Sequence, residues 1–227
     1  MRLHIVENDI LDLKYNIVEI FKSIEGEGIR AGYLVTFIRF GGCNLRCKEC
    51  DTKYSYNEYS SFTLQEIVDK LQELECNKIT VTGGEPLIQD NVDQLLTYLS
   101  ELGYEINIET NGSVSIEPFK HLWNTFFTLD YKCPSTGMEK FMIMETNNDH
   151  IGSDDVLKFV VADENDLDTM KNIYQNYYPS CNVYVSPMYG KIDSSEIVEY
   201  LKDNKLDDIR IQIQLHKIIY DVNERGV

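Results

Sequence analysis

Three cysteines lie on one short loop, at Cys43, Cys47 and Cys50, with spacings of four and three residues. The loop follows the run 34–40, whose β-branched and aromatic residues predict a strand. Thiolates are the usual protein ligands of iron–sulfur clusters. A loop with three thiolates leaves the remaining iron of a [4Fe–4S] cubane open to a small chelating molecule. The spacing therefore predicts a cluster with one exchangeable position.

A structural zinc site is the alternative use of the same cysteines. Such sites take four ligands, commonly as two Cys-x-x-Cys or Cys/His pairs. Here Cys47 and Cys50 form one such pair, and Cys133 or a histidine would have to complete the site. A zinc-stabilised binding module without catalysis thus remains the rival from a different class of protein. The iron, sulfide and zinc contents of the purified protein distinguish the two.

A second motif, Thr-Val-Thr-Gly-Gly-Glu-Pro at 80–86, follows a predicted strand at 78–82. Its two glycines permit a ligand to approach the backbone closely, and Glu85 adds a carboxylate. Taken alone, the motif is also a plausible strand-to-helix turn. Polar residues end the next two predicted strands as well: Glu109 closes one, and Lys132 and Ser135 follow the other.

Short β-rich runs alternate with helical ones, which predicts βαβ units and a parallel sheet. With about six such units the α/β chain is too short for a closed eight-stranded barrel, and an open partial (β/α) barrel is expected. Sites in such sheets lie at the carboxyl ends of the strands, where both motifs fall. We expect one domain over 1–227, with the cysteine loop at 41–52. The predicted strands are 34–40, 78–82, 105–109, 125–130, 156–161, 182–185 and 208–215, and the predicted helices are 63–74, 92–102, 164–178 and 193–204.

The net charge of −17 argues against nucleic acid and anionic membranes as partners. Neither a targeting segment nor an apolar run of membrane-spanning length is visible, which predicts a cytoplasmic protein. Three of the six arginines crowd into 30–46, at Arg30, Arg39 and Arg46. They would suit an anionic ligand, or they pair with nearby glutamates.

The two motifs together resemble the signature of the radical S-adenosylmethionine (SAM) superfamily. The resemblance implies a partial barrel of the radical SAM type, in which SAM chelates the open iron and is cleaved to a 5′-deoxyadenosyl radical. One departure is Glu49, where that superfamily usually has an aromatic residue near the adenine. By this resemblance the residues that contact SAM are Glu49, Cys50, Asp51, Gly84, Glu85, Glu109, Lys132 and Ser135, although Glu109 and Ser135 could equally be turn residues.

A finer resemblance covers about residues 18–220. The segment 21–32 (Phe-Lys-Ser-Ile-Glu-Gly-Glu-Gly-Ile-Arg-Ala-Gly), the run 37–43 and Gln-Leu-His-Lys at 214–217 resemble the 7-carboxy-7-deazaguanine synthase family. That family converts 6-carboxy-5,6,7,8-tetrahydropterin to 7-carboxy-7-deazaguanine with release of ammonia, on the route to queuosine. The resemblance implies a [4Fe–4S] cluster, SAM and Mg²⁺ as cofactors, a flavodoxin or ferredoxin as electron donor, and a homodimer.

The same resemblance assigns substrate contacts. Glu27 would bind the pterin ring with Glu25 beside it, and Arg39 and His216 would hold the substrate carboxylate or its polar edge. The family usually has glutamine where Glu25 stands, so this contact departs from its pattern. Thr52 would bind Mg²⁺, and a C-terminal strand near 208–217 would carry His216 to the substrate; Ile24, Gly26 and Thr82 complete the expected set.

The nearest rival within the superfamily is a glycyl-radical activase, which shares the cysteine spacing and the small size. An activase would need an open groove for a peptide, and it leaves the Glu-Gly-Glu-Gly segment at 25–28 and His216 unexplained. Taken without the resemblance, His216 would be a structural histidine and the glycines would shape a turn.

Overall fold

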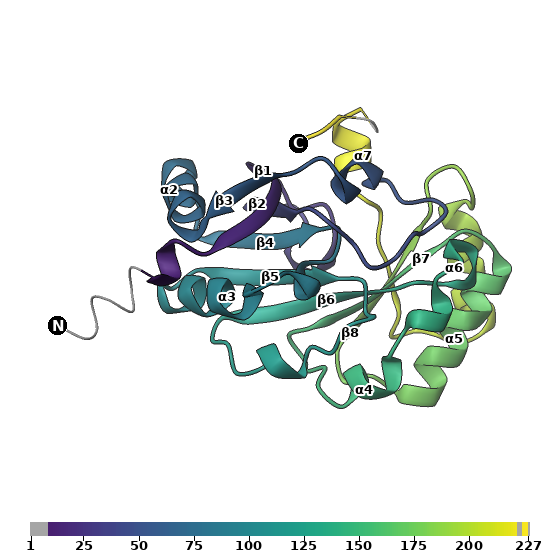
Figure 1. The fold of residues 1–227 in the computed structure, drawn as a ribbon. Coiled ribbons are helices and arrows are strands. Elements are labelled where there is room, and N and C mark those ends of the chain that lie inside the picture. Colours follow the sequence, from purple (N-terminus) through teal and green to yellow (C-terminus); the bar gives the residue numbers. More distant parts are fainter. Residues whose placement is uncertain (1–8, 222–223, 227) are drawn as a thin grey trace.

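The computed structural model describes residues 9–221 and 224–226. Its strands form one nine-stranded sheet in the order β3-β1-β2-β4-β5-β6-β7-β8-β9. Figure 1 shows this sheet with helices along its outer side. The strands are β1 (Lys14–Ile24), β2 (Leu34–Phe40), β3 (Ser60–Thr63), β4 (Lys78–Gly83), β5 (Glu105–Thr110), β6 (Thr125–Tyr131), β7 (Val156–Val161), β8 (Asn182–Pro187) and β9 (Arg210–Ile211).

The helices confirm the sequence prediction for the four longest elements. They are α2 (Leu64–Leu74), α3 (Val92–Glu101), α5 (Glu164–Tyr177) and α6 (Ser194–Asp203), to which the structure adds the short α4 (Met144–Asn148) and α7 (His216–Ile219). Capping boxes begin two of these helices. Thr63 accepts from the backbone N–H of Glu66 at the start of α2, and Asp193 is paired with Glu196 in the same way at α6.

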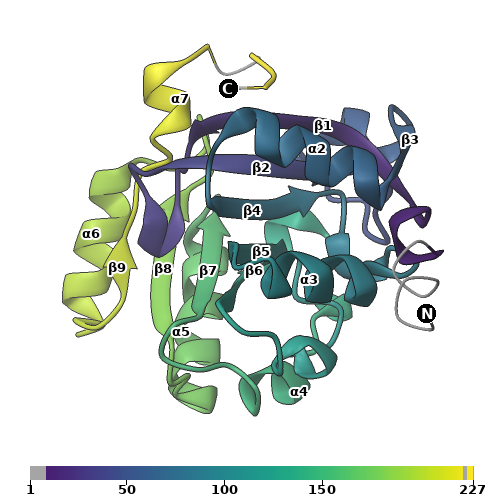
Figure 2. The same cartoon turned by 90° about the vertical axis from the view of Figure 1, so that its left-hand side faces the viewer.

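Strands β2 and β4 to β9 are parallel, whereas β1 pairs antiparallel with β2, and β3 antiparallel with β1. The strands change direction markedly between β1 and β8, so the sheet is strongly curved (Figure 2). The expected open partial barrel is therefore confirmed, with an antiparallel extension that the sequence analysis did not include.

The predicted C-terminal strand is wrong over most of its length. Pairing with β8 extends over Arg210 and Ile211 alone, and His216 begins the helix α7. The physical reason lies in the side chains. Gln212 exchanges two hydrogen bonds with the backbone of Gly28, at 2.7 and 3.0 Å, so the chain leaves the sheet and crosses to the β1–β2 connection.

The two faces of the parallel strands differ in polarity, because successive side chains of a strand point to opposite sides. The outer face carries apolar residues such as Ile79, Val81 and Phe127, all fully buried against the helices. The inner face carries buried polar residues; these include Thr80, Thr82, Asn107, Thr128, Lys158 and Ser186. Burying polar side chains costs free energy unless they are paired, so this polar interior is where a site is expected.

Among the residues that the structure describes, no helix is both long and apolar enough to cross a bilayer.

Candidate active site

The cysteine loop and the Gly-Gly-Glu-Pro motif are packed against each other at the carboxyl ends of β2 and β4. The backbone N–H groups of Gly84 and Glu85 donate to the carbonyl oxygens of Phe40 and Gly42, at 3.0 and 2.9 Å. A Cβ atom on Gly84 would lie 1.8 Å from the carbonyl oxygen of Gly42 and 3.1 Å from Cβ of Cys43. The absence of a side chain at Gly84 is therefore what lets the two motifs form one surface.

The three cysteines are free, partly exposed thiols on this surface. The backbone N–H of Leu45 and the side-chain amide of Asn111 point at Cys43 Sγ, at 3.4 and 3.8 Å, as donors that can stabilise a thiolate. In the described part of the chain, no three His, Cys, Asp or Glu side chains converge on a single metal ion. A cubane presents its irons at separate corners, so this loop fits a cluster better than a preformed zinc site.

Glu85 has a different place from the one expected. Its carboxylate is fully buried and accepts hydrogen bonds from Leu87 N–H (3.0 Å), Thr110 Oγ1 (2.8 Å) and Asn111 N–H (2.7 Å). These donors occupy both oxygens, so Glu85 joins the end of β4 to the end of β5. The neighbouring backbone of Gly84 lies at the same rim, and the contact of Glu85 with SAM stays a prediction.

Other residues expected to contact SAM surround the same rim. Ser135 Oγ is buried without a hydrogen-bond partner among the described residues, and the backbone N–H of Ser135 donates to Asp166 Oδ1 at 2.9 Å. Glu109 accepts from Thr82 Oγ1 at 2.7 Å, and Lys132 lies 3.0 Å from Asp130.

Glu49 turns toward a neighbouring loop of the same rim. Its carboxylate forms an ion pair of 3.2 Å with Lys191, in the loop between β8 and α6. Both side chains are about half exposed, 50% and 48%, so the pair contributes little to stability.

The connection between β1 and β2, residues 25–33, forms the floor of the barrel. Arg30 is buried in it and donates to the carbonyl oxygens of Ile79 (2.7 Å) and Glu105 (3.3 Å), at the start of two neighbouring strands. Gly28 reaches the opposite side of the barrel through its hydrogen bonds with Gln212. The floor places Glu25 and Glu27 side by side in the polar interior, both less than 9% exposed.

Lys158 of β7 is the partner of Glu27 and was not identified from the sequence. Its ammonium lies 3.0 Å from Glu27 Oε2 and 3.6 Å from Asp130 Oδ2, and the side chain is 7% exposed. Burial alone would raise the pKa of Glu27, but Lys158 and a hydrogen bond from Gln214 outweigh it and lower that pKa. Glu27 is thus an ionised carboxylate at neutral pH, available to accept hydrogen bonds.

The crowded arginines are all occupied by protein partners. Arg39 Nε lies 2.7 Å from Glu19 Oε1, and Arg46 binds two carbonyl oxygens of its own loop and covers the ring of Tyr56. Arg30 lies 3.9 Å from Glu25. Since Glu19 engages only Nε of Arg39, the two terminal nitrogens still offer donors for a ligand carboxylate. Arg39 pairs in register with Thr82, which places both on one face of the sheet.

Helix α7 brings His216 against the floor. A Cβ atom on Gly26 would lie 2.1 Å from Nδ1 of His216, and Leu215 N–H donates to the Gly26 carbonyl at 3.2 Å. Burial lowers the pKa of His216, against the attraction of Glu27, so the imidazole is neutral at neutral pH. Ile24, the last residue of β1, leads directly into this contact.

We expect Gly26→Ala to weaken substrate binding about tenfold or more while leaving the midpoint of thermal unfolding within a few degrees. The added methyl group meets the imidazole ring of His216 rather than backbone, so we expect this side chain to be displaced and the fold to be kept. Binding of the pterin substrate measured for Gly26→Ala, His216→Ala and the double variant tests this. Additive losses in the double variant would contradict it, because both changes act on the same imidazole.

Thr52 and Asp51 form the outer end of the cysteine loop. Thr52 Oγ1 donates to Asp51 Oδ1 at 2.9 Å, and Lys217 of α7 lies 3.6 Å from Asp51 Oδ2. Two hard oxygens thus lie between the cysteines and α7, which is the donor chemistry that Mg²⁺ accepts.

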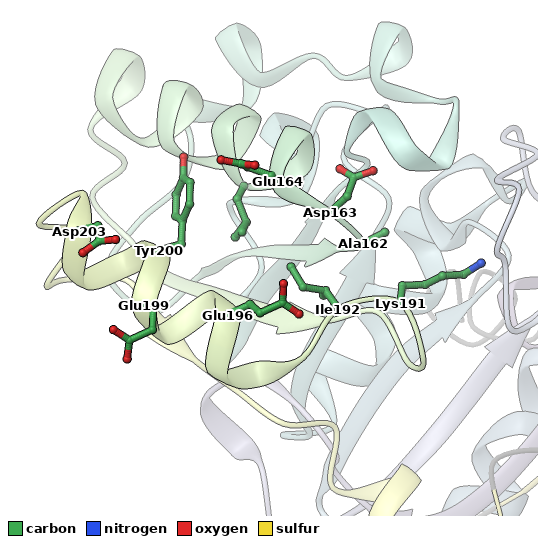
Figure 3. Close-up of a pocket in the computed structure, with 10 residues that line it drawn as sticks. Ala162, Asp163, Glu164, Lys191, Ile192, Glu196, Glu199, Tyr200 and Asp203 are labelled. Atoms are coloured by element: carbon green, nitrogen blue, oxygen red, sulfur yellow. The ribbon is translucent and has the colours of Figure 1, made fainter.

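A separate cleft of about 440 Å³ lies between α5 and α6, as Figure 3 shows. Acidic side chains dominate its lining, and two of them have structural roles. Asp163 caps α5 and Glu196 completes the capping box of α6. Lys191, drawn at its edge, extends to Glu49 instead. The lining contains no cysteine, so this cleft is not the candidate active site.

The comparisons with known proteins agree with this geometry. The sequence profile of the Radical SAM superfamily matches residues 37–151, which contain both motifs. The chain therefore belongs to the radical SAM enzymes.

Within that superfamily, a protein of Clostridium acetobutylicum named 7-carboxy-7-deazaguanine synthase is 45% identical over 222 residues, covering 95% of this chain and all of the relative. A protein of the same name from Methanospirillum hungatei is 37% identical, over 89% of this chain and 84% of the relative. The chain belongs to the 7-carboxy-7-deazaguanine synthase family.

The crystal structure titled QueE from Escherichia coli superposes with a TM-score of 0.73, over 92% of this chain and 98% of that one. At 21% sequence identity it supports the fold.

Proposed function

We propose that the polar interior between the floor and the cysteine loop binds 6-carboxy-5,6,7,8-tetrahydropterin. The chain is a radical SAM enzyme of the 7-carboxy-7-deazaguanine synthase family, which forms 7-carboxy-7-deazaguanine by ring contraction with release of ammonia. The observation that carries the proposal is the pair Glu25 and Glu27, buried in the barrel below three free cysteines.

The floor binds the pyrimidinone edge of the pterin. Ionised Glu27 accepts from its N–H groups, and Lys158 keeps this carboxylate in place. At the other end of the ring, the free nitrogens of Arg39 form a fork for the substrate carboxylate. Thr82 and neutral His216 bind the polar edges between these two ends.

The rim holds the cofactors. Cys43, Cys47 and Cys50 ligate the cluster, and the backbone of Gly84 with Ser135, Glu109 and Lys132 contacts SAM. Cluster and SAM together supply the radical that removes hydrogen from the pterin. We place Mg²⁺ at Thr52, with Asp51 nearby and the substrate carboxylate as a further ligand, because Mg²⁺ prefers hard oxygen ligands.

We further propose a flavodoxin or ferredoxin as reductant, a homodimer, a single radical SAM domain and a cytoplasmic location. The dimer proposal follows from strands β3 and β9, which form the two edges of the open sheet.

Anaerobic assay of the reconstituted protein with dithionite, SAM, Mg²⁺ and the carboxytetrahydropterin tests the function. We expect 7-carboxy-7-deazaguanine by mass spectrometry. Arg39→Ala should lower kcat/KM about 100-fold, as expected when a charge-assisted contact worth ~3 kcal/mol is removed. Thr52→Ala should raise the Mg²⁺ concentration needed for half-maximal rate.

Two other outcomes would assign the chain elsewhere, and a third would change only the proposed site. Slow 5′-deoxyadenosine without deazapurine would retain the radical SAM core and reject the substrate, and an activase would gain support. A colourless protein with one zinc per chain would reject the cluster. Arg39→Ala with an unchanged KM and kcat would remove Arg39 from the substrate site.

A further inference from the structure

The two floor glutamates have cations at different distances. Lys158 Nζ is within hydrogen-bond reach of Glu27, at 3.0 Å, whereas the nearest nitrogen of Arg30 is 3.9 Å from Glu25. This nitrogen, Nη2 of Arg30, instead donates a hydrogen bond to the Ile79 carbonyl oxygen, at 2.7 Å. Glu25 is thus buried as deeply as Glu27, at 2% exposure, without a cation bonded to it.

Thr80 connects Arg30 to Glu25. Arg30 Nη2 also donates to Thr80 Oγ1 at 2.7 Å, so the single hydroxyl proton of Thr80 is committed to its other partner, Glu25 Oε2. That hydrogen bond engages one carboxyl oxygen and leaves Oε1 as the oxygen for a ligand.

The other charged groups around Glu25 act on its pKa in both directions. Burial first, and then the negative charge of Glu109 on β5, raise the pKa of Glu25 to about 8. Thr80 and Arg30 oppose this and Glu27 adds to it, without reversing it. When the environments of two neighbouring carboxyl groups push their pKa values apart, one group is protonated and the other ionised. The two then take opposite proton-transfer or hydrogen-bonding roles.

We propose that Glu25 recognises the substrate as a neutral carboxylic acid that donates a hydrogen bond from Oε1, while Glu27 accepts as a carboxylate. This inference rests on the proposed function and specifies which hydrogen bonds the same site forms with its substrate. The pyrimidinone edge of a pterin presents N–H donors beside a carbonyl acceptor. Two carboxylates would leave that carbonyl facing a negative charge, whereas one acid and one carboxylate match both kinds of group.

This arrangement also accounts for the departure in the floor motif. The family pattern has glutamine at this position, whose amide both donates and accepts. A carboxyl group of the same shape can donate only when protonated. Burial and the negative charge of Glu109 favour that protonated form, and the Arg30 guanidinium at 3.9 Å does not reverse it, so Glu25 specifies a ligand with a ring carbonyl.

The test is substrate affinity against pH. Cluster-reconstituted protein without reductant binds 6-carboxytetrahydropterin anaerobically without turnover, so its Kd can be measured by calorimetry. The neutral form is lost as the pH rises through about 8, so Kd at pH 9 should be about tenfold higher than at pH 7. In Glu25→Gln the ratio of the two Kd values should fall to nearly one, whatever the Kd at pH 7. Because both proteins meet the same ligand, its own titration cancels in the comparison.

A second variant covers the case in which Glu25→Gln does not fold. Thr80→Val removes a hydrogen bond that lowers the pKa of Glu25, so the inflection of affinity should move to higher pH. Thr36→Val is the matched control: its hydroxyl is buried in the neighbouring strand β2 without a partner in the described structure, and it should leave the inflection in place.

A readout without ligand completes the test. Glu25 binds its proton more tightly in the folded state, so its contribution to stability is present below the unfolded pKa and is lost as the pH rises toward about 8. Unfolding by urea between pH 5 and 8 should therefore show a steeper decline for the wild type than for Glu25→Gln.

Equal Kd ratios for wild type and Glu25→Gln, or an unmoved inflection in Thr80→Val, would overturn the inference. Deazapurine formation by the same preparation would show that the proposed function stands in that case. Failure of the wild type to form the product or bind the pterin would instead overturn the proposed function.

Discussion

Lys158→Met is expected to reduce substrate affinity by 100-fold or more and to lower the free energy of unfolding by about 3–5 kcal/mol. Removing one partner of a buried ion pair leaves an uncompensated charge, and losses of that size follow. Here the loss affects Glu27 at 3.0 Å and Asp130 at 3.6 Å. Calorimetric binding of the pterin and urea unfolding at pH 7, both under anaerobic conditions, measure the two effects.

Two further variants separate the loss of charge from the loss of packing. Glu27→Gln added to Lys158→Met should restore part of the stability without restoring binding, because the neutral amide no longer needs a cation. Lys171→Met is the matched control, since Lys171 on α5 is 26% exposed and 3.6 Å from Asp168. It should change stability by about 0.5 kcal/mol or less. Similar losses in Lys158→Met and Lys171→Met would contradict the role of Lys158.

The pH dependence of Lys158→Met follows from the lowered pKa of Glu27. In the wild type, Glu27 contributes stability above its unfolded pKa that is lost as the pH falls through the folded value. Without Lys158, burial dominates and the folded pKa rises above the unfolded one. The variant should then recover stability on acidification, relative to the wild type.

Much of the sheet and its four main helices could be predicted from periodicity, because βαβ units repeat a local pattern. The extension by β1 and β3 could not. Strand β1 pairs antiparallel with β2 and is joined to it by a short loop with a single 3-10 turn rather than by an α-helix, so it does not show the alternation that was used to find strands.

The C-terminal segment shows why alternation of polar and apolar residues mispredicted the last strand of the sheet. Residues 212–215 alternate like a strand, but the polar side chains of Gln212 and Gln214 bind the floor at Gly28 and Glu27. Pairing with β8 and side-chain contacts with the floor compete for the same residues, and the floor contact is made to Gly28, 184 residues earlier than Gln212.

The site was predicted best where its residues are sequential, as in the cysteine loop. Lys158 was missed because its partners come from other elements. A signal was present: Lys158 is the single charged residue in the strand sequence Val-Leu-Lys-Phe-Val-Val. A lysine inside a buried strand requires a buried acid, and the two glutamates at 25 and 27 were the candidates.

Gly84→Ala is expected to abolish cluster loading and to reduce activity at least 100-fold. The new Cβ would lie 1.8 Å from the Gly42 carbonyl oxygen, and the backbone at both positions also carries the hydrogen bonds between the two motifs. One motif must move, which displaces Cys43 from its neighbours. Overpacking of this kind costs about 1–3 kcal/mol, so the protein should remain folded. Iron and sulfide per chain, with the visible absorption of the cluster, measure the effect.

Gly152→Ala provides the matched control, because its added Cβ would lie 3.8 Å from the nearest atom, a carboxylate oxygen of Asp155. This variant should load iron like the wild type. Circular dichroism of both variants before reconstitution separates a misplaced loop from an unfolded chain. Full iron content in Gly84→Ala would show that the cysteine loop adjusts independently of the Gly-Gly-Glu-Pro motif. If both variants lost iron equally, general destabilisation rather than the contact between the two motifs would be the cause.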